Sequence, residues 1–446
     1  MRIDLPEPEI VRQLMERVTG QMLSSTPTGI TLDAREVKTG DLFVALPGER
    51  VDGHKFLPQA EENGCSAALI SNRESSSSLP QIVVEDTSDF LGKIAREWRL
   101  QFSLPVIGIT GSNGKTTTKD LLTHIFSDNR VHATRGNFNT HLGLPLTLLE
   151  LTSRHTLSIL EMGANHLGDI GYLCGLSKPD HGLITNIAPA HLNGFGTINN
   201  IVKTKGELFD SLPEDGYAFV NWQDSYIKDI PTAARKISFG FSHDCDFATD
   251  IDKDDDGMII LTINSHEIDL NSCQDIFALN VIAACSVSIS LGVEWDTFRE
   301  KILSFEPSKG RCQIKKFDGI TIIDDTYNAN LNSTLSALDY LKSIPGNGRR
   351  IMVFGDMLEL GNDSENHHKK VGDSCAAKEL DLLLCYGNQS NVTVNTAESI
   401  IEAQHFDEKK RLSEVLRENI KEGDMILFKG SRGMAMETVI EEVFEN

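Results

Sequence analysis

The sequence predicts an α/β protein with three domains: a small α/β N-terminal domain, a central domain with a mostly parallel sheet, and a C-terminal Rossmann-like open sheet. At 446 residues the chain is too long for one ordinary hydrophobic core. From residue 104 onward, apolar strand-like runs alternate with helical stretches, which is the pattern of βαβ units. This alternation restarts near residue 312. We therefore expect domains at residues 1–103, 104–311 and 312–446.

The N-terminal domain is expected to open with a helix, because residues 9–18 repeat apolar side chains at helical spacing. Short apolar runs at 41–46 and 67–71 predict strands, and a helix is expected at 88–101. These elements together predict a small mixed domain.

The central domain is expected to hold a mostly parallel sheet with helices between its strands. An insertion around 235–270 predicts further short strands. Within it, the acidic stretch at 244–256 lacks the glycine and terminal glutamate of an EF-hand in register, so we expect an exposed hairpin or loop. Strands are expected at 156–161, 182–186 and 217–222, and helices at 198–212 and 275–291.

The C-terminal domain is predicted to be a second, separate open sheet. In such sheets ligands lie at the carboxyl ends of the strands. Polar stretches at 324–330, 355–361 and 429–432 each follow a predicted strand, so we expect them to line one edge of the sheet. Strands are expected at 320–324, 351–355, 382–386 and 425–429, and helices at 333–342, 373–378, 412–420 and 434–444.

Residues 108–119 read Gly-Ile-Thr-Gly-Ser-Asn-Gly-Lys-Thr-Thr-Thr-Lys and follow the apolar run at 104–107. A strand, a glycine turn and a helix start in this order present backbone N–H groups and a helix dipole to phosphate oxygens. The spacing departs from the common P-loop, because Ile109 stands where its first glycine falls. A plain Gly/Ser turn leaves the Gly-Lys-Thr-Thr-Thr run unexplained. Lys115 is expected on the β/γ-phosphates and the Thr116 hydroxyl on Mg²⁺. The expected ATP or GTP contacts are Thr110, Gly111, Ser112, Asn113, Gly114, Lys115, Thr116 and Thr117.

Composition excludes several partners. The formal net charge of −23 argues against nucleic acid and anionic membranes. No apolar segment approaches a membrane span, and the first residues lack the features of a signal peptide. The eight cysteines are scattered without a C-x-x-C pair, which is typical of reduced cysteines in a cytosolic protein. We therefore expect a cytoplasmic protein.

Three further residues, two near strand ends and one on a helix, are candidate metal ligands. Glu161 ends an apolar strand, and a carboxylate beside a P-loop suits Mg²⁺. His191 follows the strand at 182–186, although a lone histidine there is more often structural. Lys205 lies on a predicted helix and is most simply a solvated lysine. If it were buried and neutral, CO₂ could convert it to a carbamate with carboxylate-like oxygens.

Two further residues have alternative interpretations. Asn280 lies in the middle of an apolar helix, where a buried amide needs a partner; it is either a core bridge or an adenine contact. Arg311 stands at the junction of the second and third domains. It either reaches a phosphate across an interdomain cleft or is a linker cation.

These motifs resemble the ATP-dependent Mur ligase family of peptidoglycan synthesis. The loop at 110–117 has the short form of that family, and matches run from Gly-Asp-Leu-Phe-Val-Ala-Leu at 40–46 to Lys-Gly-Ser-Arg at 429–432. Glu-Met-Gly-Ala-Asn-His at 161–166 and Asp-Asp-Thr-Tyr-Asn-Ala-Asn at 324–330 resemble the branch that adds D-alanyl-D-alanine. The resemblance implies a UDP-sugar-binding domain, a central P-loop ATPase and a C-terminal Rossmann-like domain.

The resemblance also implies roles by motif match. The catalytic residues would be Lys115, His191, Lys205 and Arg311, with Arg311 on the γ-phosphate. Thr116 and Glu161 are implied on a first Mg²⁺, and His191 with carbamylated Lys205 on a second; Lys203 is a rival for the carbamate. Other implied contacts are Asn280 and Asn328 to adenine, Asp325 on the adenosine side, and Asp33, Arg35, Asn137 and Asn139 to the UDP-muramoyl-peptide.

The implied activity is addition of D-alanyl-D-alanine to UDP-N-acetylmuramoyl-tripeptide through an acyl phosphate, with ATP and two Mg²⁺ ions as cofactors. We expect a monomer. The nearest alternative is a sister amide ligase of the diaminopimelate-adding or folylpolyglutamate type. A nucleotide-driven switch that makes no bond is an alternative from another class, and a non-catalytic scaffold is the third.

Overall fold

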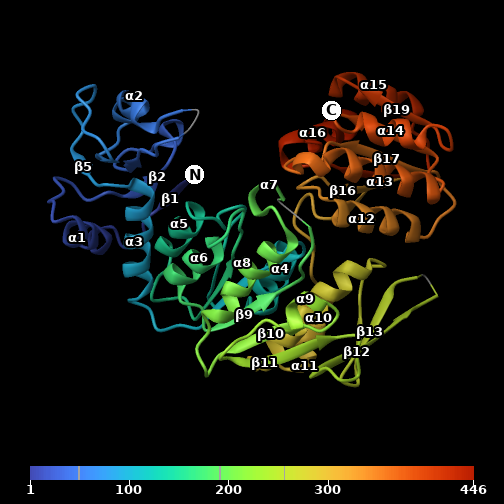
Figure 1. Cartoon of the computed structure of the whole chain (residues 1–446), viewed down its shortest axis with the longest axis horizontal. Helices are drawn as coiled ribbons and strands as arrows, with labels where there is room; N and C mark the ends of the chain where they lie inside the picture. Colours follow the sequence, from blue (N-terminus) through green and yellow to red (C-terminus); the bar gives the residue numbers. More distant parts are fainter. Residues whose placement is uncertain (49–50, 190–191, 256, 446) are drawn as a thin grey trace.

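The computed structural model describes residues 1–48, 51–189, 192–255 and 257–445. Within them the chain forms three sheets, one after another along the sequence, of five, nine and six strands. Figure 1 shows the first and last sheets on the same side of the central one, at its opposite ends, so the chain has the outline of an arch. The predicted α/β fold with three sheet-containing regions is confirmed.

The N-terminal region is a small sheet flanked by helices. Its main elements are β1 (Arg2–Asp4), α1 (Pro8–Thr19), β2 (Gly29–Thr31), β3 (Leu42–Val44), α2 (Leu57–Glu62), β4 (Ala67–Ile70), β5 (Gln81–Val83) and α3 (Thr87–Arg99). β1 is antiparallel to β2, and the other neighbours are parallel. The Asp86 side chain caps α3 by accepting two N–H groups of its first turn. The Trp98 indole N–H donates to the Leu151 oxygen, 3.2 Å away, and so ties α3 to the central region.

The central sheet places the phosphate loop between two strand ends. The strands and helices that build this part are β6 (Val106–Thr110), α4 (Lys115–Ile125), β7 (Val131–Ala133), α5 (Gly143–Leu149), β8 (Leu157–Glu161), α6 (Asp169–Ser177), β9 (His181–Ile184), α7 (Leu192–Phe195), α8 (Ile198–Asp210), β10 (Tyr217–Asn221), α9 (Ser225–Lys228) and β11 (Arg235–Gly240). β6 lies between β8 and β9, with Ile109 opposite Glu161 and Thr110 opposite Ile184. Because parallel strands end at one edge, the loop after β6, Glu161 and the segment after β9 meet there.

The predicted insertion extends this sheet. Its strands are β12 (Phe247–Lys253), β13 (Ile259–Ile263) and β14 (His266–Asp269), followed by α10 (Asp275–Ser290) and α11 (Trp295–Leu303). β12, β13 and β14 pair as antiparallel hairpins, and the second half of β12 is exposed. Residues 250–253 of the acidic stretch are therefore exposed and lie in a hairpin, as predicted, whereas Cys245, Phe247 and Thr249 are buried. Met258 and Cys273 of the insertion pack against the apolar core of the C-terminal region.

The C-terminal region is an open, mostly parallel six-stranded sheet. Its elements are β15 (Gln313–Phe317), β16 (Ile320–Asp325), α12 (Leu331–Ser343), β17 (Arg350–Gly355), α13 (Ser364–Ala377), β18 (Leu382–Tyr386), α14 (Asn391–Ala397), β19 (Ala403–Phe406), α15 (Lys409–Asn419), β20 (Met425–Lys429) and α16 (Glu437–Ile440). β20 lies between β16 and β17, and all three are parallel. Their carboxyl ends therefore lie side by side, which confirms that the three polar stretches share one edge.

Two predicted helices of this region differ from the structure. α13 begins at Ser364, nine residues before the predicted start at 373. The histidines of its first half, His367 and His368, are buried, although their polarity hid the helical pattern. The helix predicted at 434–444 is broken, because Ala435 has a left-handed φ of 47° and α16 begins only at Glu437.

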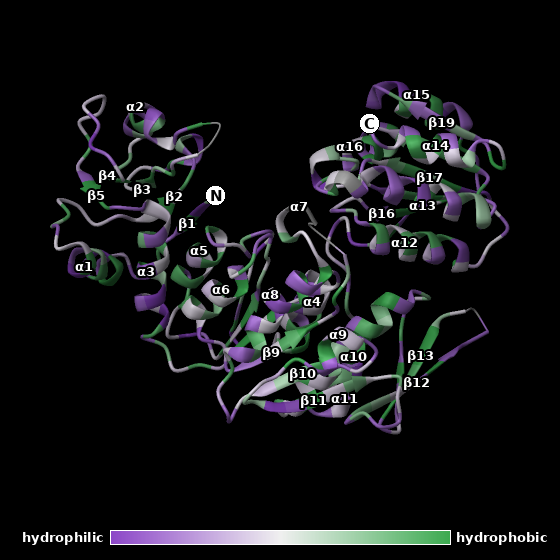
Figure 2. Cartoon of the chain, in the orientation of Figure 1, coloured by the Kyte–Doolittle hydropathy of each residue, from purple (hydrophilic) through white to green (hydrophobic). Residues whose placement is uncertain are grey.

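Apolar side chains form several separate clusters, two of them on the two faces of the C-terminal sheet. Figure 2 shows hydrophobic residues concentrated on the strands and on the helix faces against them, with polar residues outside. All eight cysteines lie in the described part of the chain, and each is free. Among the described residues, we find no helix with both the length and the apolar composition needed to cross a membrane.

Candidate active site

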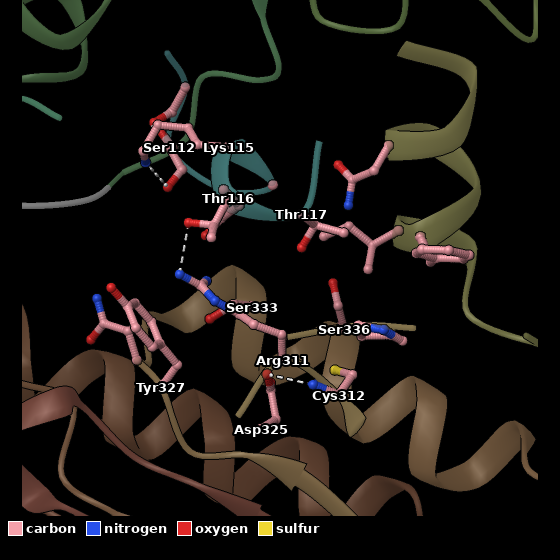
Figure 3. Close-up of a pocket in the computed structure, with 18 of the residues that line it drawn as sticks. Ser112, Lys115, Thr116, Thr117, Arg311, Cys312, Asp325, Tyr327, Ser333 and Ser336 are labelled. Atoms are coloured by element: carbon pink, nitrogen blue, oxygen red, sulfur yellow. Dashed lines mark hydrogen bonds between the residues drawn. The ribbon is translucent and has the colours of Figure 1, made fainter. Parts of the chain in front are cut away.

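A cavity of about 660 Å³ lies between the central and C-terminal regions. Its walls include the phosphate loop, the end of β8, the start of α10 and the segments after β16 and β20. Figure 3 shows Lys115 and Thr116 on one side and Arg311 and Tyr327 on the other. The predicted site residues that line it are Gly111, Ser112, Asn113, Gly114, Lys115, Thr116, Thr117, Asn137, Asn139, Glu161, Lys205, Asn280, Arg311, Asp325 and Asn328.

The phosphate loop is held in shape by the segment after β9. The Ser112 N–H donates to the Asn186 backbone oxygen at 2.9 Å, and the Asn113 N–H donates to Oδ1 of Asn186 at 3.0 Å. Gly114 has a left-handed φ of 81°, and a Cβ there would lie 2.4 Å from Oδ1 of Asn280. Only glycine fits both constraints. The loop therefore takes its turned shape from contacts within the central region.

Two lysines, Lys205 buried and Lys115 half-buried, share one backbone acceptor. Nζ of Lys115 lies 2.7 Å from the Gly111 oxygen, and Nζ of Lys205 lies 2.9 Å from the same oxygen. Burial, and then the neighbouring charge of Lys115, lower the pKa of Lys205 well below its ordinary value. Lys203 is exposed. The structure thus brings Lys205 to the cavity and leaves its rival Lys203 outside.

Glu161 has the chemistry of a cation ligand. The side chain is 2% exposed, and its Oε1 accepts a hydrogen bond from Nδ2 of Asn139 at 2.7 Å. Its Oε2 is buried and finds no hydrogen-bond partner among the described residues. A buried carboxylate oxygen without a donor is costly, and a cation would satisfy it. The residues present therefore fit a Mg²⁺ ion at this point, with the Thr116 hydroxyl in the same cavity.

Arg311 reaches the phosphate loop from across the cavity. Its Nη2 donates to Oγ1 of Thr116 at 2.9 Å, and the Tyr327 ring lies 3.8 Å from the guanidinium carbon (Figure 3). Such stacking fixes the plane of the guanidinium. Nε of Arg311 is buried without a partner in the described chain. Arg311 is therefore positioned at the phosphate end of the cavity, with donor capacity left over.

The residues predicted on the adenosine side differ in how many of their side-chain atoms are already hydrogen-bonded. Both carboxylate oxygens of Asp325 are engaged, one by Nζ of Lys429 at 2.5 Å and the other by the Cys312 N–H at 3.2 Å. Lys429 also donates to the backbone oxygen of Asn328 at 3.0 Å. Among the described residues, Oδ1 of Asn280 accepts one long hydrogen bond, 3.4 Å, from the Thr118 hydroxyl. Asp325 thus braces the loop that carries Asn328.

Some predicted residues lie elsewhere. Thr110 is buried at the end of β6, where its hydroxyl donates to the Met162 oxygen at 2.9 Å. Asp33 and Arg35 pair with each other at 2.6 Å in the N-terminal region and do not line the cavity. His191 lies outside the described residues.

Sequence reasoning missed three residues that shape the cavity. Tyr327 stacks on Arg311, and Lys429 binds Asp325 while 1% exposed. Asn330 donates from Nδ2 to Oδ1 of Asn113 at 2.7 Å and so bridges the two walls. All three lie in the polar stretches that follow predicted strands, and this placement is the sequence feature that could have identified them.

A phosphate loop on a parallel sheet, closed over by a second α/β region with cationic side chains, defines a P-loop nucleotide-binding protein. Comparison with protein-family models identifies the family within this class. The Mur ligase middle domain matches residues 109–288, the Mur ligase glutamate ligase domain matches 310–432, and the Mur ligase family catalytic domain matches 26–99. The chain belongs to the Mur ligase family, which confirms the predicted resemblance. The boundaries at 103 and 311 stay a prediction.

Relatives match over nearly the whole chain. UDP-N-acetylmuramoyl-tripeptide–D-alanyl-D-alanine ligase of Escherichia coli K12 is 34% identical over 97% of this chain and 98% of that protein. The crystal structure of MurF from Acinetobacter baumannii has a TM-score of 0.87 and 31% identity, with 98% of each chain covered. MurF ligase from Thermotoga maritima in complex with ADP has a TM-score of 0.79 and 31% identity, covering 93% of this chain and 96% of that one.

Proposed function

We propose that this protein is an ATP-dependent, ADP-forming amide ligase that adds D-alanyl-D-alanine to UDP-N-acetylmuramoyl-tripeptide in peptidoglycan synthesis. One observation carries the proposal. A chain similar over nearly its full length to ligases of that name has one cavity lined by a phosphate loop, by Arg311 and by Glu161, whose Oε2 has no hydrogen-bond partner among the described residues. ATP is the nucleotide, in keeping with the ADP complex of the Thermotoga maritima relative.

The residues around the cavity divide the work of phosphoryl transfer. A peptide carboxylate is a poor electrophile, so it is first phosphorylated by ATP, and the dipeptide amine then attacks the acyl phosphate to form the amide and release phosphate. Lys115 and Arg311 offset the negative charge as one anion approaches another. Glu161 and Thr116 would hold Mg²⁺, which would supply further charge neutralisation when bound. Closure of the C-terminal region excludes water that would hydrolyse the acyl phosphate.

A second Mg²⁺ is proposed on His191 and carbamylated Lys205. The burial of Lys205 and its lowered pKa favour the neutral amine that reacts with CO₂. The carbamate would be an anion beside the Lys115 ammonium, which is a favourable pairing. Mass spectrometry after trapping the carbamate by alkylation tests this ligand; an unmodified Lys205 in metal-loaded protein would argue against it.

The proposal extends to the contacts with adenosine and with the UDP-muramoyl-peptide. Asn280 and Asn328 are proposed at adenine, with Asp325 bracing the adenosine side. Asn137 is proposed at the muramoyl-peptide, and Asp33 with Arg35 at the UDP group. We further propose a cytoplasmic monomer, in keeping with the eight free cysteines.

One incubation tests the proposed reaction. Pure protein, ATP, Mg²⁺, UDP-muramoyl-tripeptide and D-alanyl-D-alanine should yield the pentapeptide product by mass spectrometry. Parallel reactions with a diamino acid or glutamate as acceptor distinguish the sister ligases. A switch would hydrolyse ATP at full rate without any acceptor, whereas the ligase should turn over slowly unless both substrates are present.

A further inference from the structure

Asn139, in the loop after β7, is attached to the end of β8 at two points. The Asn139 side chain donates from Nδ2 to Oε1 of Glu161 at 2.7 Å. The Asn139 backbone oxygen accepts from the Gly163 N–H, also at 2.7 Å. One residue thus holds both the Glu161 side chain and the backbone two positions beyond it.

This attachment distinguishes the two oxygens of Glu161. An ionised carboxylate only accepts hydrogen bonds, so the amide nitrogen of Asn139 must face it. The Glu161 backbone is fixed as well, because its N–H donates to the Thr134 hydroxyl at 3.0 Å. With Oε1 taken, Oε2 is the oxygen left without a partner in the described residues. The carboxylate therefore has one orientation rather than two equivalent ones.

The packing at Gly163 accommodates the Asn139 side chain. A Cβ added at Gly163 would lie 3.0 Å from Oδ1 of Asn139, so the absence of a side chain there makes room for the amide. Asn139 also lines the cavity beside Asn137 and Thr140. One of the two N–H groups of its amide donates to Glu161 at 2.7 Å, so the amide is already engaged at the end of β8.

We propose that Asn139 is a positioning residue for the magnesium ligand Glu161: its amide occupies Oε1 and leaves Oε2 as the oxygen available to the cation. The inference rests on the proposed function, since it needs Glu161 to bind Mg²⁺. It gives Asn139 a role at the metal site, where the sequence resemblance implied only a contact to the muramoyl-peptide. Loss of such a hydrogen-bond partner of a metal ligand typically weakens metal affinity 10- to 100-fold.

Mn²⁺ with ADP is the probe that tests this role. Free Mn²⁺ is followed by electron paramagnetic resonance while full-length protein saturated with ADP is titrated with the metal. Asn139→Leu keeps the approximate volume and removes the donor, so we expect about tenfold weaker Mn²⁺ binding. Thr140→Val is the matched control on the same wall, and its Mn²⁺ affinity should stay within twofold of the unchanged protein. ADP affinity measured without metal should not change in either variant.

The steady-state assay adds a second readout. Asn139→Leu should raise the Mg²⁺ concentration needed for half-maximal rate about tenfold, while the rate at saturating Mg²⁺ largely recovers. If Asn139→Leu fails to fold, Asn139→Ser carries the same test, because serine is too short to reach Glu161. A folded variant of either kind with unchanged Mn²⁺ affinity overturns the inference. Absence of Mn²⁺ binding by the unchanged protein with ADP overturns the proposed function instead.

Discussion

The two walls of the cavity are built differently. The central wall (residues 111–117, Glu161 and Lys205) consists of side chains held by bonds within the central region, and both Glu161 and Lys205 are buried. The opposite wall (Arg311, Tyr327 and Asn330) reaches across the cavity, through Arg311 to Thr116 and Asn330 to Asn113. The first wall forms when the central region folds, whereas the second depends on where the C-terminal region lies. We expect the central wall to bind nucleotide and metal, and the opposite wall to act on the transferred phosphoryl group.

The largest expected effect breaks the central wall. Lys115→Met keeps the length of the side chain and removes its charge, so the ligase rate should fall about 10³-fold, or about 4 kcal/mol in the barrier. Thermal unfolding should change little, because the ammonium bonds only its own loop. The measurement is kcat for pentapeptide formation. A variant with more than a tenth of the original rate would show that Lys115 does not act on the phosphates.

The next effect breaks the opposite wall alone. Arg311→Ala should lower kcat about 10²-fold, close to 3 kcal/mol, because charge stabilisation in the transition state is lost. ADP affinity, measured by calorimetry, should stay within about threefold if the two walls have the separate roles described above. An equal loss in ADP affinity and kcat would mean that Arg311 serves binding in general, and the contrast between the walls would disappear.

The pH dependence of unfolding tests how the central wall is supported behind Glu161. His132 of β7 is buried next to β8; Nε2–H donates to the Thr147 oxygen and Nδ1 accepts from the Ser158 hydroxyl. Burial, partly opposed by the bond to Thr147, lowers the pKa of His132 from 6.5 to about 4. Between about pH 4 and pH 6.5, His132 is protonated in the unfolded chain but neutral in the folded chain. The free energy of unfolding therefore falls as the pH drops from about 6.5 to about 4.

His132→Gln should reduce this loss by about 2 kcal/mol between pH 7 and pH 4.5. Urea unfolding of the two proteins at both pH values gives the difference. Other buried histidines contribute equally to both proteins and cancel in the comparison. If the pH dependence is identical in the two proteins, His132 is not the buried neutral base that the structure indicates.

The smallest expected effect concerns the bridge between the walls. Asn330 caps α12 with its Oδ1 and donates to Asn113 with its Nδ2. Asn330→Ser preserves a good N-cap and is too short to reach Asn113. A double-mutant cycle with Asn113→Ala on the KM for ATP should give a coupling of about 1 kcal/mol, the net value of one hydrogen bond. Strictly additive effects would show that the bridge carries no energy in solution.

Local patterns allowed the sequence to predict much of the central wall. The glycine turn with Lys115 and Thr116 is contiguous, and the place of Glu161 follows from the rule that parallel strands end at one edge. The same rule brought 324–330 and 429–432 together. Short edge strands such as β15 and β19 were missed, because few apolar residues alternate in them.

The opposite wall was less predictable, because its contacts join distant residues. Asn330 and Asn113 are 217 positions apart, and no local pattern encodes their approach. Stacking of Tyr327 on Arg311 likewise depends on how the linker turns. Burial separates Lys205 from its rival Lys203, which lies two positions away on the same helix and is exposed.

The packing of Met258 and Cys273 against the C-terminal core has a mechanical consequence. Oγ of Ser343 in α12 lies 3.6 Å from Sγ of Cys273, so the last turn of that helix packs against the insertion. A rotation of the C-terminal region must either keep this contact as its pivot or break it and expose its apolar side chains to water. Rotation about this contact costs less free energy than breaking it, because no apolar surface is exposed. The contact therefore gives the enzyme a fixed pivot outside the reacting centre.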